Sequence, residues 1–178
     1  MGFLATILAL ALTFFGGDLP YRVAVPVAFD GYHQAPLDDP PPEKIESLKD
    51  QMFERINAER ANEGLPSYSR RYDSIAQTRS DDMVARGYFG HTTPEGAQGY
   101  VVAIYQAGYV DFYWAGENLA RYSERPNLVN EVMAGLMGSP LHRANIMEPY
   151  VFDSVGIGVT RHPDGTVYFA QIFASGMR

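Results

Sequence analysis

Three short segments of the sequence carry residues that could do chemistry, each beside turn-forming residues. The first, FGHTTPEG, contains His91, whose imidazole can project from backbone outside a regular element. The second, AGENLA, contains Glu117 in an apolar stretch, where a buried carboxylate needs a partner. The third, SPLHRANI, contains His142 three residues after Ser139. Because the chain has no cysteine, histidine and carboxylate groups are its candidate metal ligands.

His142 is expected in the first turn of a helix, with Ser139 as the N-cap and Pro140 at the first helical position. The partial positive charge of a helix N-terminus disfavours an imidazolium, so His142 is expected to stay neutral. A neutral imidazole can bind a metal ion or accept a proton. Each of these residues alone is more often structural, but their occurrence together in three loop-like segments favours one polar site.

The elements that must position this site follow from hydrophobic spacing. Apolar residues at intervals of three and four predict helices over about 43–63, 70–86, 97–106 and 128–137. Gly64 and Gly87 are expected to end the first two. Alternation in 155–160, the turn HPDG and the apolar run 166–173 predict a β-hairpin. We therefore expect an α/β fold, a three-layer α/β/α sandwich with a small, mostly antiparallel central sheet.

The N-terminal part has a different composition. Residues 1–17 begin with an apolar run shorter than the roughly 20 residues of a transmembrane helix, which favours a signal peptide or a membrane anchor. No basic residue precedes the run and no clear cleavage site follows it, so cleavage and anchoring both stay open, as does a buried helix. Residues 18–42 are rich in proline and glycine and predict a linker or arm, which leaves 43–178 as one domain.

The charge of the chain excludes one class of partner. A net charge of -7, without a dense Lys/Arg stripe, would repel a phosphate backbone, so nucleic acid is not expected to bind. Membrane contact is expected only if the N-terminal segment remains uncleaved. An export segment places the protein outside the cytoplasm, secreted or in the cell envelope.

Several motifs in this order resemble the CAP superfamily, which comprises the cysteine-rich secretory, antigen 5 and pathogenesis-related proteins, in a cysteine-free bacterial form. The resemblance covers INAER with GLP, GYFGHT, GENLA, SPLHRANI and VGIGV, from Ile56 to Val159. It implies an α/β/α sandwich with a polar cleft. By position, His91, Glu117 and His142 match three of the four cleft residues of that family, which has two histidines and two glutamates. Ser139 stands where the second glutamate would be.

Three functions compete on this basis. The resemblance implies a cleft that binds a hydrophobic small molecule, a peptide or a cell-envelope component without catalysis, and this is the favoured hypothesis. The second is a metal-dependent hydrolase, because His91, His142 and Glu117 form a ligand set suited to zinc, with Glu95 nominated as general base. The third is a purely structural hydrogen-bonded cluster. A Ser139–His142 nucleophile pair is disfavoured, because a capping serine is a poor nucleophile.

Overall fold

The computed structural model describes residues 22–23, 27–30 and 44–178. The predicted signal or anchor segment and most of the predicted linker lie outside these described residues. Five helices are described: α1 Ile45–Asn62, α2 Asp73–Ala85, α3 Gly99–Gln106, α4 Leu128–Gly138 and α5 Pro140–Met147. The described strands are β1 Arg22–Val23, β2 Val27–Asp30, β3 Ser69–Arg70, β4 Trp114–Ser123, β5 Ser154–Arg161 and β6 Thr166–Ser175.

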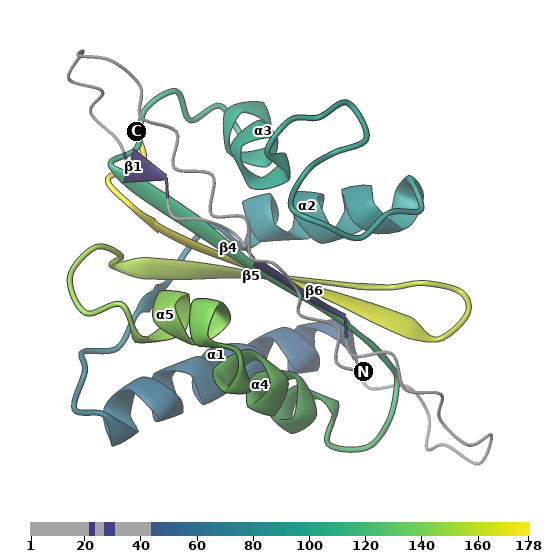
Figure 1. The fold of residues 1–178 in the computed structure, drawn as a ribbon, viewed down its shortest axis with the longest axis horizontal. Helices are drawn as coiled ribbons and strands as arrows, with labels where there is room; N and C mark the ends of the chain where they lie inside the picture. Colours follow the sequence, from purple (N-terminus) through teal and green to yellow (C-terminus); the bar gives the residue numbers. More distant parts are fainter. Residues whose placement is uncertain (1–21, 24–26, 31–43) are drawn as a thin grey trace, which may run out of the picture.

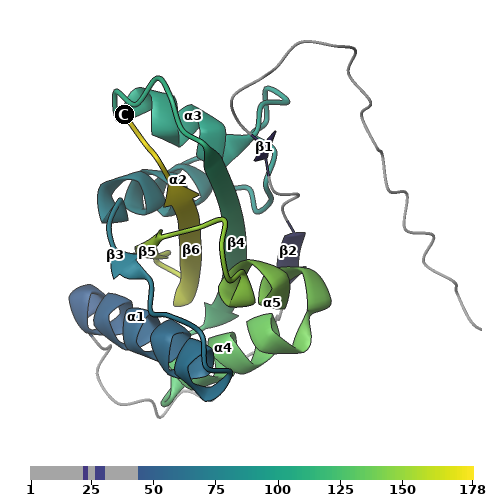
Figure 2. The same ribbon diagram turned by 90° about the vertical axis from the view of Figure 1, so that its left-hand side faces the viewer.

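These elements form three layers. Helices α2 and α3 cover one face of the sheet, and α1, α4 and α5 cover the other face (Figure 1; Figure 2). Buried apolar side chains fill the space on both sides of the sheet. The predicted α/β/α sandwich is therefore confirmed.

The sheet is built on three long strands. β6 lies between β4 and β5 and pairs antiparallel with both, over ten and eight residues respectively. The short strands β1 and β2 pair parallel with β4, and β3 pairs parallel with β5. The sheet is thus mixed: its long strands are antiparallel, as expected, and the parallel pairs come from strands of two to four residues.

Local signals account for most helix ends. Helix α1 begins just after the proline run and ends before Gly64, which has a φ of +69°. Helix α2 begins at Asp73, three residues later than the predicted start at 70, because Ser69 and Arg70 pair with β5 instead. Helix α3 begins at Gly99 after an isolated bridge between Thr92 and Gln98. The largest of these shifts, at the start of α2, is set by pairing with a strand far along the chain.

Helix α2 lies very close to the sheet, and two glycines of β5 explain why. A Cβ atom at Gly156 would overlap the backbone carbonyl of Tyr72, and one at Gly158 would overlap that of Ala76. The alternating glycines in VGIGV therefore leave room for the helix backbone itself. This close approach fixes the position of α2 against β5 and β6, next to the strand β4 that carries Glu117. Among the described residues, no helix is long and apolar enough to cross a membrane.

Candidate functional site

Two of the predicted site residues are in direct contact. Glu117 lies in β4 opposite Ile172 of β6, and its side chain has no solvent exposure. His91 lies in the loop between α2 and α3, and its Nδ1 is 2.6 Å from Glu117 Oε2. A carboxylate on Nδ1 orients the ring and leaves Nε2 as the atom that would meet a ligand. Nε2 is buried and has no hydrogen-bond partner among the described residues.

The second carboxylate oxygen of Glu117 is held by a residue that the sequence analysis missed. Arg79 of α2 forms an ion pair with it, with 2.8 Å between Nε and Oε1. The Arg79 side chain is only 1% exposed. A signal for this residue was present in the sequence: Ile75, Arg79 and Met83 follow at intervals of four, so the arginine lies on the buried stripe of its helix. A charge on such a stripe requires a buried partner.

Other groups hold the Arg79 guanidinium in place. Its Nη1 donates to Tyr88 Oη at 2.8 Å, and its Nη2 donates to the carbonyl of Gly90. A Cβ atom at Gly99 would overlap the guanidinium, so a larger residue at the start of α3 would force Arg79 to shift. Tyr100, next in the chain, is fully buried, and burial together with the nearby charge of Glu117 raises the pKa of its phenol. The carboxylate is thus enclosed by a fixed cation, an imidazole and a phenol that stays protonated.

Glu95, nominated as a general base, lies elsewhere. Its side chain is 67% exposed and pairs with Arg86 at the end of α2. The hydrogen bond from Arg86 lowers the pKa of Glu95 to about 2. A carboxylate with so low a pKa is a weak base, so the position and the environment of Glu95 do not favour that role.

His142 occupies the first turn of α5 and is fully buried. A buried amide network joins its helix to β4: Asn118 Nδ2 donates to the His142 carbonyl at 3.1 Å, and Asn145 Nδ2 donates to the Glu117 carbonyl at 3.3 Å. Asn118 also donates to the Gln171 side chain. The AGENLA strand therefore contacts α2 through its glutamate and α5 through its asparagine, and sequence reasoning missed the second contact.

Ser139 is the N-cap residue of α5, as predicted, but its hydroxyl makes no capping hydrogen bond. Its backbone carbonyl instead accepts the N–H of Arg143 at 2.9 Å. The expected side-chain cap is therefore wrong. The hydroxyl also makes no hydrogen bond to His142 among the described residues, so the serine still lacks the base that a nucleophile needs.

The donor set does not fit a zinc ion as it stands. Both oxygens of Glu117 are occupied, one by Arg79 and one by His91. A metal ion at this position would have to displace a buried guanidinium from the carboxylate. Within residues 22–23, 27–30 and 44–178, no group of three or more histidine and carboxylate side chains could hold a metal.

Comparisons with known proteins show which family the chain resembles. The family model described as CAP, cysteine-rich secretory protein family, matches residues 53–173. None of the curated proteins compared with the chain matches it. A solved extracellular protein with an SCP domain from Bacillus anthracis is 26% identical, with a TM-score of 0.60, over 74% of this chain and 41% of its own.

Two further solved structures show the same fold at lower identity. An outer surface protein from Borrelia burgdorferi is 18% identical, with a TM-score of 0.60, over 75% of this chain and 96% of its own. A cysteine-rich secretory protein from Staphylococcus aureus is 16% identical, with a TM-score of 0.59, over 81% of this chain and 42% of its own. The chain thus spans less than half of the Bacillus and Staphylococcus proteins. With a family model matching residues 53–173 and a sandwich shared with these bacterial proteins, the chain belongs to the CAP, or cysteine-rich secretory protein, family.

Proposed function

We propose that this protein is an exported CAP-domain protein that binds a ligand without transforming it. One observation carries the proposal: both oxygens of the Glu117 carboxylate are occupied, by Arg79 and by His91. A zinc hydrolase built on this site would need the Glu117 carboxylate to hold the metal ion or to take a proton from water. Here the carboxylate is committed to a buried ion pair.

The energetics of that pair support a binding role. Removing one partner of a buried ion pair typically costs about 3–5 kcal/mol, because the other charge is left without compensation. Binding of a metal ion or substrate to Glu117 would be weakened by a free energy of this size, because it would break the ion pair with Arg79.

The extracytoplasmic location rests on separate observations. The apolar run at the N-terminus favours export. The Bacillus neighbour is described as extracellular and the Borrelia neighbour as an outer surface protein. We propose the same side of the membrane for this chain.

Zinc titration of the full chain tests the proposal that the protein does not transform its ligand. ZnCl₂ is titrated into wild-type protein by calorimetry, and fluorescein-labelled casein is offered as a general peptidase substrate with and without EDTA. We expect no stoichiometric zinc site and no chelator-sensitive turnover. Stoichiometric zinc with casein cleavage that is lost both in EDTA and in Glu117→Gln would overturn the proposal.

Location is tested on protein recovered from its own cells. The mature N-terminus is determined by mass spectrometry in the culture medium, the envelope and the cytoplasm. We expect the protein in the medium or the envelope, with a start beyond residue 17 if the segment is a signal peptide and with Met1 if it is an anchor. Protein found only in the cytoplasm would refute export.

A further inference from the structure

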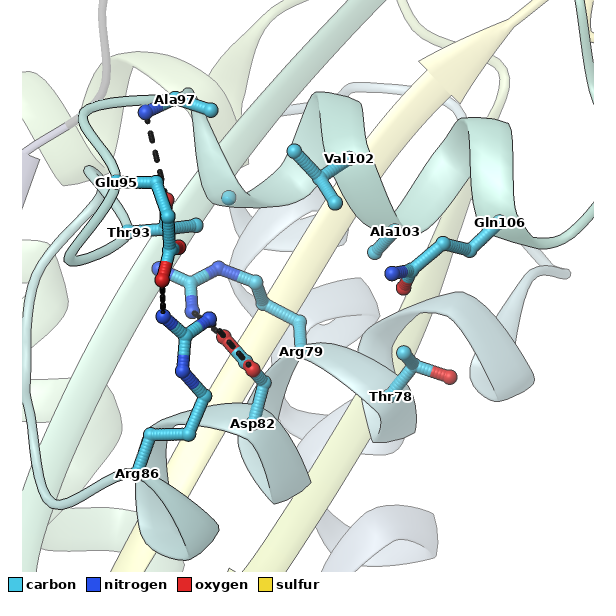
Figure 3. A pocket seen from close by; sticks show the side chains of 11 residues that line it. Thr78, Arg79, Asp82, Arg86, Thr93, Glu95, Ala97, Val102, Ala103 and Gln106 are labelled. Atoms are coloured by element: carbon cyan, nitrogen blue, oxygen red, sulfur yellow. Dashed lines mark hydrogen bonds and ion pairs between the residues drawn. The ribbon is translucent and has the colours of Figure 1, made fainter.

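A cavity of about 280 Å³ lies between α2, α3 and the loop that joins them, on the side of Arg79 away from the sheet (Figure 3). Its volume corresponds to about nine water molecules at the liquid value of about 30 Å³ each. It is lined by Thr78, Arg79, Asp82, Arg86, Thr93, Glu95, Ala97, Gly99, Val102, Ala103 and Gln106. The size suits a single side chain or a short aliphatic molecule, not a sterol.

The charges of the lining do not cancel at the mouth. The inner cation, Arg79, pairs with Glu117 at 2.8 Å and with Asp82 at 3.9 Å. At the mouth, Arg86 pairs with both Glu95 and Asp82, so one guanidinium serves two carboxylates (Figure 3). Asp82 is held in place because Tyr88 donates to its Oδ2. Three carboxylates, those of Glu117, Asp82 and Glu95, thus share two guanidinium groups, so this cluster carries an excess of one negative charge.

The opposite wall is apolar apart from Gln106 at the end of α3. Helix α3 presents Val102 and Ala103 to the cavity, and Ala97 and Gly99 add small residues before and at the start of the helix (Figure 3). Such a wall accepts methylene groups, each worth about 0.8 kcal/mol when fully buried. The cavity thus combines a short apolar wall with an anionic rim.

We propose that this cavity binds a primary ammonium group on an aliphatic stem, the chemistry of a lysine side chain in a peptide. The stem lies along α3, and the ammonium takes the place of the Arg86 guanidinium between Asp82 and Glu95. Displacement of Arg86 is cheap because its side chain is 35% exposed and that of Glu95 is 67% exposed. The inference rests on the proposed binding function and names a ligand class for it, at a place distinct from His91 and Glu117.

An anionic ligand is disfavoured by the same lining. A carboxylate at the mouth would meet Asp82 and Glu95, and Arg86 would have to leave both to receive it. The sign of the ligand charge can therefore be read from the effect of removing each rim charge in turn.

The test measures binding of acetyl-Ala-Lys-Ala-amide to the full chain by ¹⁵N NMR shifts. Arg86→Gln removes the competing cation and should tighten binding about two- to fivefold, whereas Glu95→Gln should weaken it about two- to fivefold, the range for exposed charges. The matched controls are Arg143→Gln and Glu63→Gln, an exposed Arg–Glu pair elsewhere on the surface, which should leave the affinity unchanged.

Shifts confined to α2, α3 and residues 93–97, with opposite effects of the two rim variants, would support the proposal. No binding of the lysine peptide by wild type and Arg86→Gln would overturn it, as would equal binding of the N-ε-acetyl-lysine peptide. Tighter binding of acetyl-Ala-Asp-Ala-amide would overturn it in favour of an anion. None of these outcomes depends on zinc or turnover, so failure here is distinguishable from failure of the proposed function.

Discussion

The buried ion pair between Arg79 and Glu117 should dominate the energetics of the site. Arg79→Met keeps most of the side-chain volume and removes the charge, so the carboxylate of Glu117 loses its cation in an environment with no solvent exposure. Breaking a buried pair in this way costs about 3–5 kcal/mol. Because native domains are stable by about 5–15 kcal/mol, this is a large share of the total.

A double-mutant cycle separates the pair from its surroundings. Glu117→Gln alone should also destabilise, because it leaves the guanidinium uncompensated, but the double variant should be more stable than the two single costs imply. We expect a coupling energy of about 2–3 kcal/mol from urea unfolding, and a fall in Tm of about 6–20 °C for Arg79→Met.

Matched controls come from the exposed pair Arg143–Glu63, whose side chains are 44% and 55% exposed. Arg143→Met, Glu63→Gln and their double variant should each change stability by less than about 1 kcal/mol. If Arg79→Met costs no more than Arg143→Met, or if the buried pair shows additive costs, the reasoning that places Arg79 at the centre of the site is refuted.

Three further predictions follow from single contacts. Gly158→Ala should destabilise by about 1–3 kcal/mol, because the new Cβ would overlap a backbone carbonyl of α2; Gly138→Ala, which meets open space, should be neutral or slightly stabilising in thermal melts. The pKa of Glu95 in the folded protein is about 2, below its ordinary value of 4.5, so its contribution to folding stability is present above about pH 4.5 and is lost as the pH falls toward 2. NMR titration of the Glu95 carboxyl in Arg86→Gln should show this pKa rising toward 4.5. Asn118→Leu should cost about 1–3 kcal/mol in urea unfolding by leaving buried acceptors without a donor, and an unchanged midpoint would count against the amide network.

Local sequence signals predicted the fold because its main boundaries are locally encoded. The proline run before Lys44 and the glycine at 64 delimit α1, and the alternation in VGIGV marks β5. The start of α2 was misplaced because Ser69 and Arg70 pair with a strand about 85 residues later, which no local pattern reports. The alternating glycines of β5 predict a strand, but the sequence does not indicate that they also make room for α2.

The candidate site was predictable to the extent that its residues have short-range signals. Loop context and the family resemblance predict His91 and Glu117 as site residues, and the two side chains are in contact in the structure. Loop context and resemblance also predict that the Glu117 carboxylate is available to a ligand. They take account of histidine and acidic residues but not of Arg79 on the buried face of α2. The partner of a buried charge depends on tertiary packing, and only a search for charges on apolar stripes would have found Arg79.

Arg79 also connects the Glu117–His91 pair to the cavity between α2 and α3. From Glu117 the contacts pass through Arg79 to Tyr88, from Tyr88 to Asp82, and from Asp82 to the rim of the cavity. A ligand that draws on Asp82 therefore changes the partner of the tyrosine that holds the guanidinium. Arg79 therefore links the Glu117–His91 pair to Asp82, the carboxylate that the proposed ammonium group would contact.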